Sequence, residues 1–171
     1  MKVAVVQMQC AVGDVDANVA GMAQAIGDAG RAGASLVVFP ELCDTGYDMG
    51  AVRRAAAVWP GGACEPLAAA SASANVSTVC GLSERDGDSL HNSCAVFGAD
   101  GELLGSYRKA HLYRTDRFSE ADTFSAGDSL VTVKVGAVCL GLLICFDLRF
   151  PEHSRSLVRR GAKALVVVSA W

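Results

Sequence analysis

Apolar residues in the first forty positions follow two periods, one typical of strands and one of a helix. Residues 2–7 are a short β-rich run, and the apolar run at residues 35–39 predicts a buried strand. The segment between them has helix-starting residues at 14–18 and ends near Gly30 and Gly33. Its apolar face is made by Val19, Met22, Ala23 and Ile26. A strand, a helix and a strand in succession usually place the two strands parallel.

The rest of the chain continues this alternation, so we expect an α/β fold. The predicted helices cover residues 52–74, with a break at 59–62, and residues 151–161. The predicted strands are residues 76–82, 92–97, 103–107, 131–135, 137–144 and 164–169. Ala99-Asp100-Gly101 and Gly136 each separate two of these strands, which predicts two hairpins. Residues 108–128 are polar with weak periodicity, so we expect a long loop with short helical turns.

One predicted strand ends in a cysteine. Residues 138–144 are almost uninterruptedly apolar, Cys145 follows them, and a helix is predicted from Pro151 to Gly161. This order places a thiol at the C-terminal end of a strand, where sheets covered by helices usually hold ligands. The predicted helix starts several residues after the thiol, so we do not expect its dipole to reach the sulfur. The alternative is that Cys145 is a small buried apolar residue.

Composition indicates a single globular domain over residues 1–171. Apolar residues make up 51% of the chain and charged residues 19%. The net charge of −3 and the lack of a Lys/Arg cluster argue against nucleic acid as a partner. Seven cysteines with no C-x-x-C pair argue against a zinc knuckle and favour reduced thiols. No apolar run approaches the length of a membrane span, so we expect no membrane partner and a cytoplasmic protein.

Three residues capable of chemistry each follow a predicted strand. Glu41, Lys109 and Cys145 would supply a carboxylate, an ammonium and a thiol at one edge of the fold. Together they would suit acyl transfer, in which the carboxylate takes the thiol proton and the ammonium stabilises the oxyanion. Taken singly, Glu41 could be a helix cap or surface residue, and Lys109 a solvated lysine.

The segments around these residues resemble the three signature blocks of the nitrilase superfamily, the carbon–nitrogen hydrolases. The blocks are residues 36–41 (LVVFPE), 107–112 (YRKAHL) and 143–152 (LICFDLRFPE), in the family's order. Asn92 is a lesser matching mark. The resemblance runs from residue 1 to residue 171 but covers only about the first two-thirds of the family's domain.

The resemblance implies a four-layer α-β-β-α sandwich, here C-terminally incomplete, and assembly as a homodimer or higher homo-oligomer. It assigns Glu41 as general base, Lys109 as oxyanion stabiliser and Cys145 as nucleophile, with a thioester intermediate and no metal or cofactor. Glu120 precedes Phe124-Ser-Ala-Gly127 and would orient Lys109 and the substrate. The alternative for Glu120 is an exposed loop carboxylate. We also expect Lys109 to favour the thiolate form of Cys145.

The substrate implied is a small-molecule amide, as in the amidase branch that includes ω-amidases. Arg149 could anchor a substrate carboxylate, or form a structural ion pair with Asp147 or Glu152. The Phe146 backbone N–H is a candidate second oxyanion donor. Tyr47 and Trp171 could line the pocket or pack in the core.

Two rival hypotheses remain at this stage. One is a Cys–His hydrolase using His91, His111 or His153, although we expect His111 to hold its loop by hydrogen bonds. The other is a catalytically incompetent fragment or degenerate homologue that only binds or dimerises, because the absent C-terminal part would expose a sheet edge.

Overall fold

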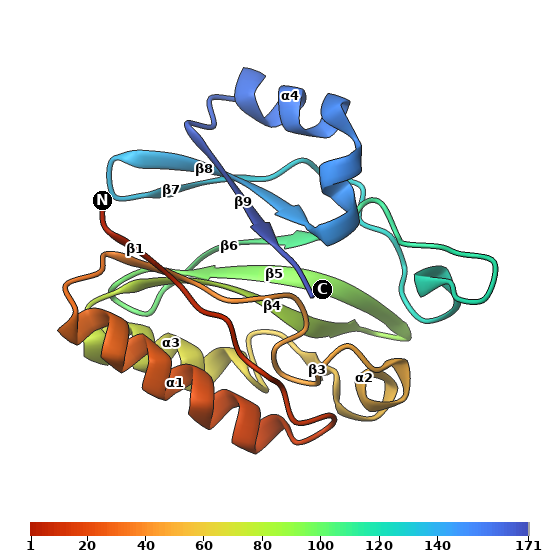
Figure 1. Ribbon diagram of the computed structural model, residues 1–171, viewed down its shortest axis with the longest axis horizontal. Coiled ribbons are helices and arrows are strands. Elements are labelled where there is room, and N and C mark those ends of the chain that lie inside the picture. Colours follow the sequence, from red (N-terminus) through yellow and green to blue (C-terminus); the bar gives the residue numbers. More distant parts are fainter. Residues whose placement is uncertain (171) are drawn as a thin grey trace.

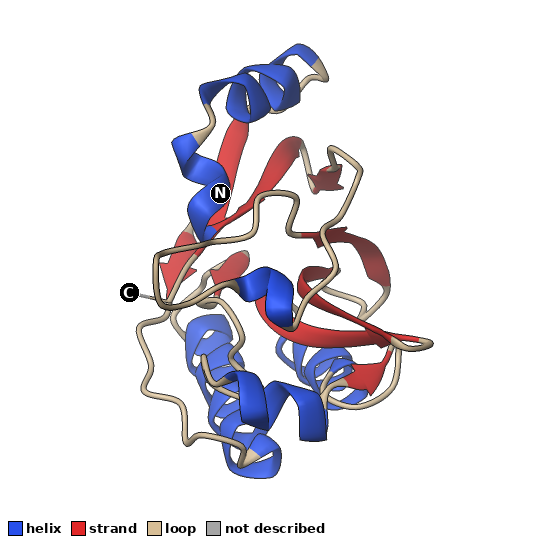
Figure 2. Cartoon of the chain, turned by 90° about the vertical axis from the view of Figure 1, so that its right-hand side faces the viewer, coloured by secondary structure: helices blue, strands red, loops and turns tan. Residues whose placement is uncertain are grey.

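The computed structural model describes residues 1–170 and has four layers (Figure 1). Helices α1 (Val15–Arg31) and α3 (Cys64–Ala74) cover one face of a six-stranded sheet. The other face of that sheet packs against a three-stranded sheet, and α4 (Pro151–Arg159) covers the far side of the second sheet. The view turned by 90° shows the same order of layers (Figure 2). The expected α-β-β-α sandwich is therefore confirmed.

The first sheet has the strand order β1-β2-β4-β5-β6, with β3 paired to the far part of β4. Its strands are β1 (Val3–Val5), β2 (Leu36–Val38), β3 (Ala57–Val58), β4 (Ser77–Asp86), β5 (Ser89–Phe97) and β6 (Leu103–Arg108). β1 and β2 are parallel, as predicted, and β5 and β6 form the predicted hairpin. Asp14 caps α1 by accepting a hydrogen bond from Ala17 N.

The second sheet carries the cysteine. Its strands are β7 (Thr132–Val135), β8 (Val138–Ile144) and β9 (Ala164–Val168). β7 and β8 form the second predicted hairpin, and β9 pairs in parallel with β8 after the crossover through α4. Pro151 occupies the first turn of α4, where its missing N–H has no helical partner to lose.

The core consists of two main apolar layers. Between the sheets, Leu36, Val96, Leu142 and Ile144 are almost completely buried. Outside the first sheet, Met22 and other buried residues of α1 pack against β2 and β4 through Val37 and Cys80. Burial of these side chains makes the hydrophobic effect the main force that holds the layers together.

Two elements differ from the predicted boundaries. The first part of the predicted 52–74 helical region is a short helix, α2 (Met49–Ala55), that begins earlier, because Asp48 caps it by accepting from Ala51 N. β4 and β5 extend well into the polar stretch 83–91 and pair across a turn at 87–88 as a third hairpin. Within residues 1–170, no helix combines the length and apolarity needed to cross a membrane.

Candidate active site

Three strand ends from the two sheets bring the candidate residues together. Glu41 follows β2 and Lys109 follows β6, both in the first sheet, whereas Cys145 follows β8 in the second. Ala170 N, just beyond β9, donates to Glu41 Oε2 at 3.0 Å, and β9 pairs with β8, so the strand ends beside Cys145 lie against Glu41. The site therefore lies at the boundary between the sheets.

A buried ammonium lies between two buried carboxylates. Lys109 Nζ is 2.8 Å from Glu41 Oε1 and 2.9 Å from Glu120 Oε1, and all three side chains are fully buried. Glu120 begins the short helical turn η1 (Glu120–Asp122), so the exposed-loop alternative for this residue is wrong. Burial alone would lower the pKa of Lys109, but the two carboxylates outweigh it and the pKa is raised. Lys109 therefore stays charged at neutral pH.

Each carboxylate is held by further hydrogen bonds. Asn92 Nδ2 donates to Glu41 Oε1 at 2.7 Å, and Ala170 N donates to Glu41 Oε2 at 3.0 Å. The Tyr47 hydroxyl donates to Glu120 Oε1 at 2.6 Å. Because these donors come from separate segments, they fix the carboxylates in place. The sequence around Asn92 indicates no function for this residue, because it lies in a polar run and contacts Glu41 only once β5 has formed.

Two glycines allow the backbone around the site to pack closely. A Cβ on Gly81 would lie 2.6 Å from Glu41 Cα, and the Gly81 N–H donates to Pro40 O at 3.0 Å. Gly127 packs as closely against Arg108, and its N–H donates to Lys109 O at 2.8 Å. Any side chain at these glycines would push on the segments that present Glu41 and Lys109.

Cys145 begins a 3-10 turn, η2 (Cys145–Arg149), directly after β8. Its φ of 45° is in the left-handed region, which side chains with a Cβ rarely adopt. This 3-10 turn fills the segment between the thiol and α4, which begins at Pro151 as predicted. Phe146 is the second residue of η2, so its N–H has no partner inside that turn.

The thiol has a raised pKa. Burial of Cys145 raises it most, and the Glu41 carboxylate raises it further, while the Lys109 ammonium lowers it. Lys109 acts in the expected direction but is outweighed. The thiol form of Cys145 therefore predominates at neutral pH.

The residues expected at the rim of the site differ in their placement. Tyr47 is 38% exposed and lines a cleft of about 520 Å³ together with Pro40 and Glu41, so it is not a core residue. Arg149 is exposed, and among residues 1–170 it forms no ion pair with Asp147 or Glu152. The ion-pair alternative for Arg149 is therefore wrong. Trp171 lies outside the described residues.

Two of the three histidines are engaged in hydrogen bonds with other residues. His91 Nδ1 is 2.9 Å from Ser125 O, and His111 is held by Asp147 through its backbone N–H and its ring. The expectation that His111 holds its loop by hydrogen bonds is confirmed. Because His91 and His111 are engaged in these hydrogen bonds, neither is free to act as the base of a Cys–His hydrolase.

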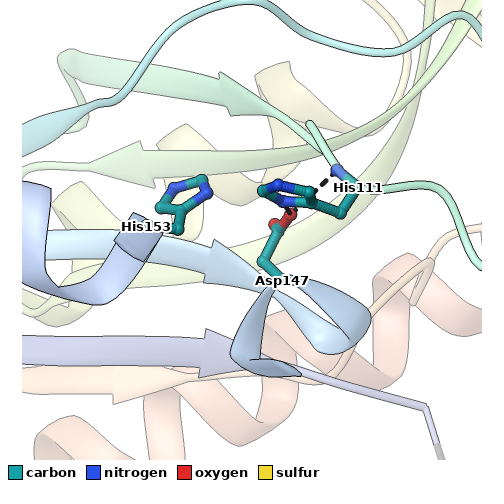
Figure 3. A group of neighbouring side chains, drawn as sticks. All are labelled: His111, Asp147 and His153. Carbon is teal, nitrogen blue, oxygen red and sulfur yellow. Dashed lines mark hydrogen bonds and ion pairs between the residues drawn. The ribbon is translucent and has the colours of Figure 1, made fainter. Parts of the chain in front are cut away.

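One group of side chains has the chemistry of metal ligands. His111, Asp147 and His153 place potential ligand atoms within 4.8 Å of one another (Figure 3). The Asp147 oxygens already accept four hydrogen bonds, from Ile144 N, the Tyr107 hydroxyl, and His111 N and Nδ1. A carboxylate offers about four such positions. A metal ion would have to displace these donors, so the arrangement fits a hydrogen-bonded cluster better than a metal centre.

Comparison with known proteins gives consistent results. The sequence model of the carbon–nitrogen hydrolase family matches residues 2–171. Omega-amidase NIT2 of Danio rerio is 34% identical over 177 residues, covering 99% of this chain and 63% of that protein. A nitrilase of Pyrococcus abyssi is 36% identical over 170 residues, covering 96% and 63%. The chain thus spans about 63% of the length of these relatives.

Solved structures show the same fold. Nit3 of Saccharomyces cerevisiae, a member of branch 10 of the nitrilase superfamily, superposes with a TM-score of 0.90 at 29% identity, covering 100% of this chain and 65% of that one. An amidase from Nesterenkonia sp. AN1, solved with acrylamide added to its active-site cysteine, gives a TM-score of 0.88 at 25% identity, covering 99% and 66%. Together with the signature blocks and the layer order, these matches establish that the chain belongs to the carbon–nitrogen hydrolase family.

Proposed function

We propose that this chain carries the catalytic residues of an amidase that hydrolyses small linear amides through a thioester on Cys145. The observation that carries the proposal is the fully buried Lys109 held between Glu41 and Glu120 beside a half-buried thiol. Burying these charges is costly unless each has partners. Their full set of partners in this position supports a catalytic role.

The raised pKa of Cys145 suggests how the first step occurs. Because most of the thiol keeps its proton at neutral pH, Glu41 takes that proton as the sulfur attacks the amide carbon. Lys109 Nζ and the Phe146 N–H stabilise the negative charge that develops on the carbonyl oxygen. Glu41 then returns the proton to the leaving amine.

The second step releases the acid. Glu41 takes a proton from water, the hydroxide attacks the thioester, and the thiol leaves with its proton restored. Glu120 contacts Lys109 and Tyr47 and thereby holds the ammonium in place through both steps.

The proposed substrate is an amide that also bears a carboxylate. Similarity to an omega-amidase supports this class. Arg149 is exposed, and a guanidinium without an ion pair to Asp147 or Glu152 in residues 1–170 is suited to bind a carboxylate. Aromatic rings of Tyr113 and Phe146, with centroids 5.3 Å apart, supply an apolar wall beside the thiol's turn.

We further propose a homodimer or higher homo-oligomer and a reducing compartment such as the cytoplasm. Val5 of β1 is 82% exposed and Leu165 of β9 is 38% exposed, so apolar strand residues are available for contacts. All seven cysteines are free thiols. Size-exclusion chromatography with light scattering tests the assembly.

Intact mass after brief mixing with ω-amides of dicarboxylic acids and with carbamoyl amino acids tests the proposed reaction. We expect an acyl adduct on Cys145 that is absent from Cys145→Ala, and an Arg149→Lys variant should form less adduct with these carboxylate-bearing substrates. If a folded, soluble protein forms no adduct with any of them, the alternative function, a non-catalytic protein that only binds or dimerises, replaces the amidase.

A further inference from the structure

A buried carboxylate lies on the turn that presents the thiol. Asp147 is the third residue of η2, two positions after Cys145, and it is 0% exposed. A buried carboxylate is unfavourable unless hydrogen bonds replace its water. The donors that replace water around Asp147 come from two different parts of the chain.

The first donor belongs to the nucleophile's own turn. Ile144 N donates to Asp147 Oδ2 at 2.9 Å, which closes the turn on either side of Cys145. The left-handed backbone of Cys145 is unfavourable for a residue with a Cβ and persists only where its surroundings hold it. This hydrogen bond is one of the contacts that hold it.

The other donors belong to the segment that presents Lys109. The Tyr107 hydroxyl donates to Asp147 Oδ2 at 2.7 Å, and the His111 N–H and ring bind Asp147 Oδ1 at 3.0 and 2.8 Å. The Tyr107 hydroxyl also accepts from Ala110 N at 3.0 Å. Residues on both sides of Lys109 are thus tied to one carboxylate (Figure 3 shows its contact with His111).

The strands that precede these two segments belong to different sheets. β6 leads to Lys109 and β8 leads to Cys145, and no hydrogen-bonded ladder joins β6 to β8. Apolar packing between the sheets is not directional, whereas hydrogen bonds are. Asp147 supplies the direct polar link between the two segments.

We infer that Asp147 is a positioning residue that fixes the separation between the Lys109 ammonium and the Cys145 thiol. The expected effect of Asp147 on kcat rests on the proposed amidase function. Its effect on the position of Lys109 relative to Cys145 does not depend on turnover. Asp147 acts through Ile144, Tyr107 and His111 and is not itself in contact with the reacting atoms in this role.

The test compares variants on the two sides of the link. Tyr107→Phe removes a donor from the Lys109 side and leaves the charge of Asp147 and the η2 turn intact. Asp147→Asn weakens both sides. Glu152→Gln is the matched control, because it removes a charge from the same segment but, among residues 1–170, no side-chain hydrogen bond.

The pH dependence of Cys145 alkylation by iodoacetamide provides a readout that needs no substrate. The extent of alkylation at each pH is measured by mass spectrometry of the peptide that contains Cys145. Lys109 lowers the pKa of Cys145, so a displaced ammonium should move the alkylation midpoint to higher pH in Tyr107→Phe and further in Asp147→Asn. With an amide that the unmodified protein hydrolyses, kcat should fall roughly tenfold to a hundredfold in Asp147→Asn, while KM stays nearly constant. This pattern is expected when catalytic groups are misplaced. Glu152→Gln should match the unmodified protein in both measurements.

Three outcomes separate the possibilities. If Tyr107→Phe leaves the alkylation midpoint unchanged while Asp147→Asn moves it, Asp147 only supports its own turn and the inference fails. If no amide is hydrolysed by the unmodified protein but the midpoints move as expected, the proposed function fails and the positioning role stands. If Asp147→Asn does not fold, the midpoint of Tyr107→Phe alone decides.

Discussion

Asn92 Nδ2 lies 2.7 Å from Glu41 Oε1 and so binds the oxygen that also contacts Lys109. Asn92→Ala should remove one hydrogen bond from a buried carboxylate, which costs about 1–3 kcal/mol of unfolding free energy. It should also lower the rate of amide hydrolysis, because Glu41 loses a contact that orients it. Ser93→Ala is the control, since the Ser93 hydroxyl is equally buried but donates to Glu84. Equal loss of hydrolysis in both variants would contradict an orienting role for Asn92.

Lys109→Met should destabilise the protein strongly. It leaves Glu41 and Glu120 buried without their shared cation, and breaking a buried ion pair costs about 3–5 kcal/mol. The double variant Lys109→Met with Glu120→Gln has one uncompensated carboxylate in place of two. Urea denaturation should therefore find the double variant more stable than the single one, and the reverse order would contradict the arrangement of charges.

Glu41→Gln should separate thiol reactivity from hydrolysis. The Glu41 carboxylate raises the pKa of Cys145, so removing its charge should lower that pKa and increase the thiolate fraction at pH 8. Iodoacetamide should then alkylate Cys145 faster than in the unmodified protein. Amide hydrolysis should fall by roughly 10²–10⁴, since the general base is gone. Slower alkylation would show that Glu41 does not act on the thiol by its charge.

Gly81→Ala should impair the site through the backbone. The added methyl group would lie 2.6 Å from Glu41 Cα and 2.7 Å from Pro40 O, so the segment carrying Glu41 must move. We expect loss of hydrolysis together with a lower melting temperature. Gly21→Ala is the control, because that helical glycine has open space around it and alanine should stabilise the helix by about 0.5–1 kcal/mol. Full activity in Gly81→Ala would contradict the close packing at Glu41.

The strand and helix periods predicted most of the architecture. Residues 35–39 and 138–144 are apolar because β2 and β8 are covered by other layers of the fold, and this made them visible in the sequence. The polar stretch 83–91 concealed the ends of β4 and β5. Ser83 in this stretch and Asn92 just after it are buried because distant partners, Asp44 and Glu41, accept their hydrogen bonds. The hydropathy pattern along the chain does not indicate such long-range hydrogen-bond partners.

The main residues of the candidate site could also be predicted from the sequence. Glu41, Lys109, Cys145 and Glu120 could be named from strand ends and from the resemblance to known signature blocks. The direction of the net pKa shift of Cys145 could not be predicted. It depends on burial and on the distances from the thiol to the opposite charges of Glu41 and Lys109, which are set only in the folded chain. Asp147 was read only as a possible ion-pair partner of Arg149, since its real donors are 36 and 40 residues away in sequence at His111 and Tyr107.

The left-handed backbone at Cys145 makes this position one where the residue needed for chemistry and the residue preferred by the fold are different. Glycine adopts a φ of 45° without a steric penalty, so Cys145→Gly should relax the turn while it abolishes thioester formation. A library selected only for resistance to heat should therefore enrich glycine at residue 145. In this protein, thermal stability and catalytic turnover would therefore favour different residues at position 145.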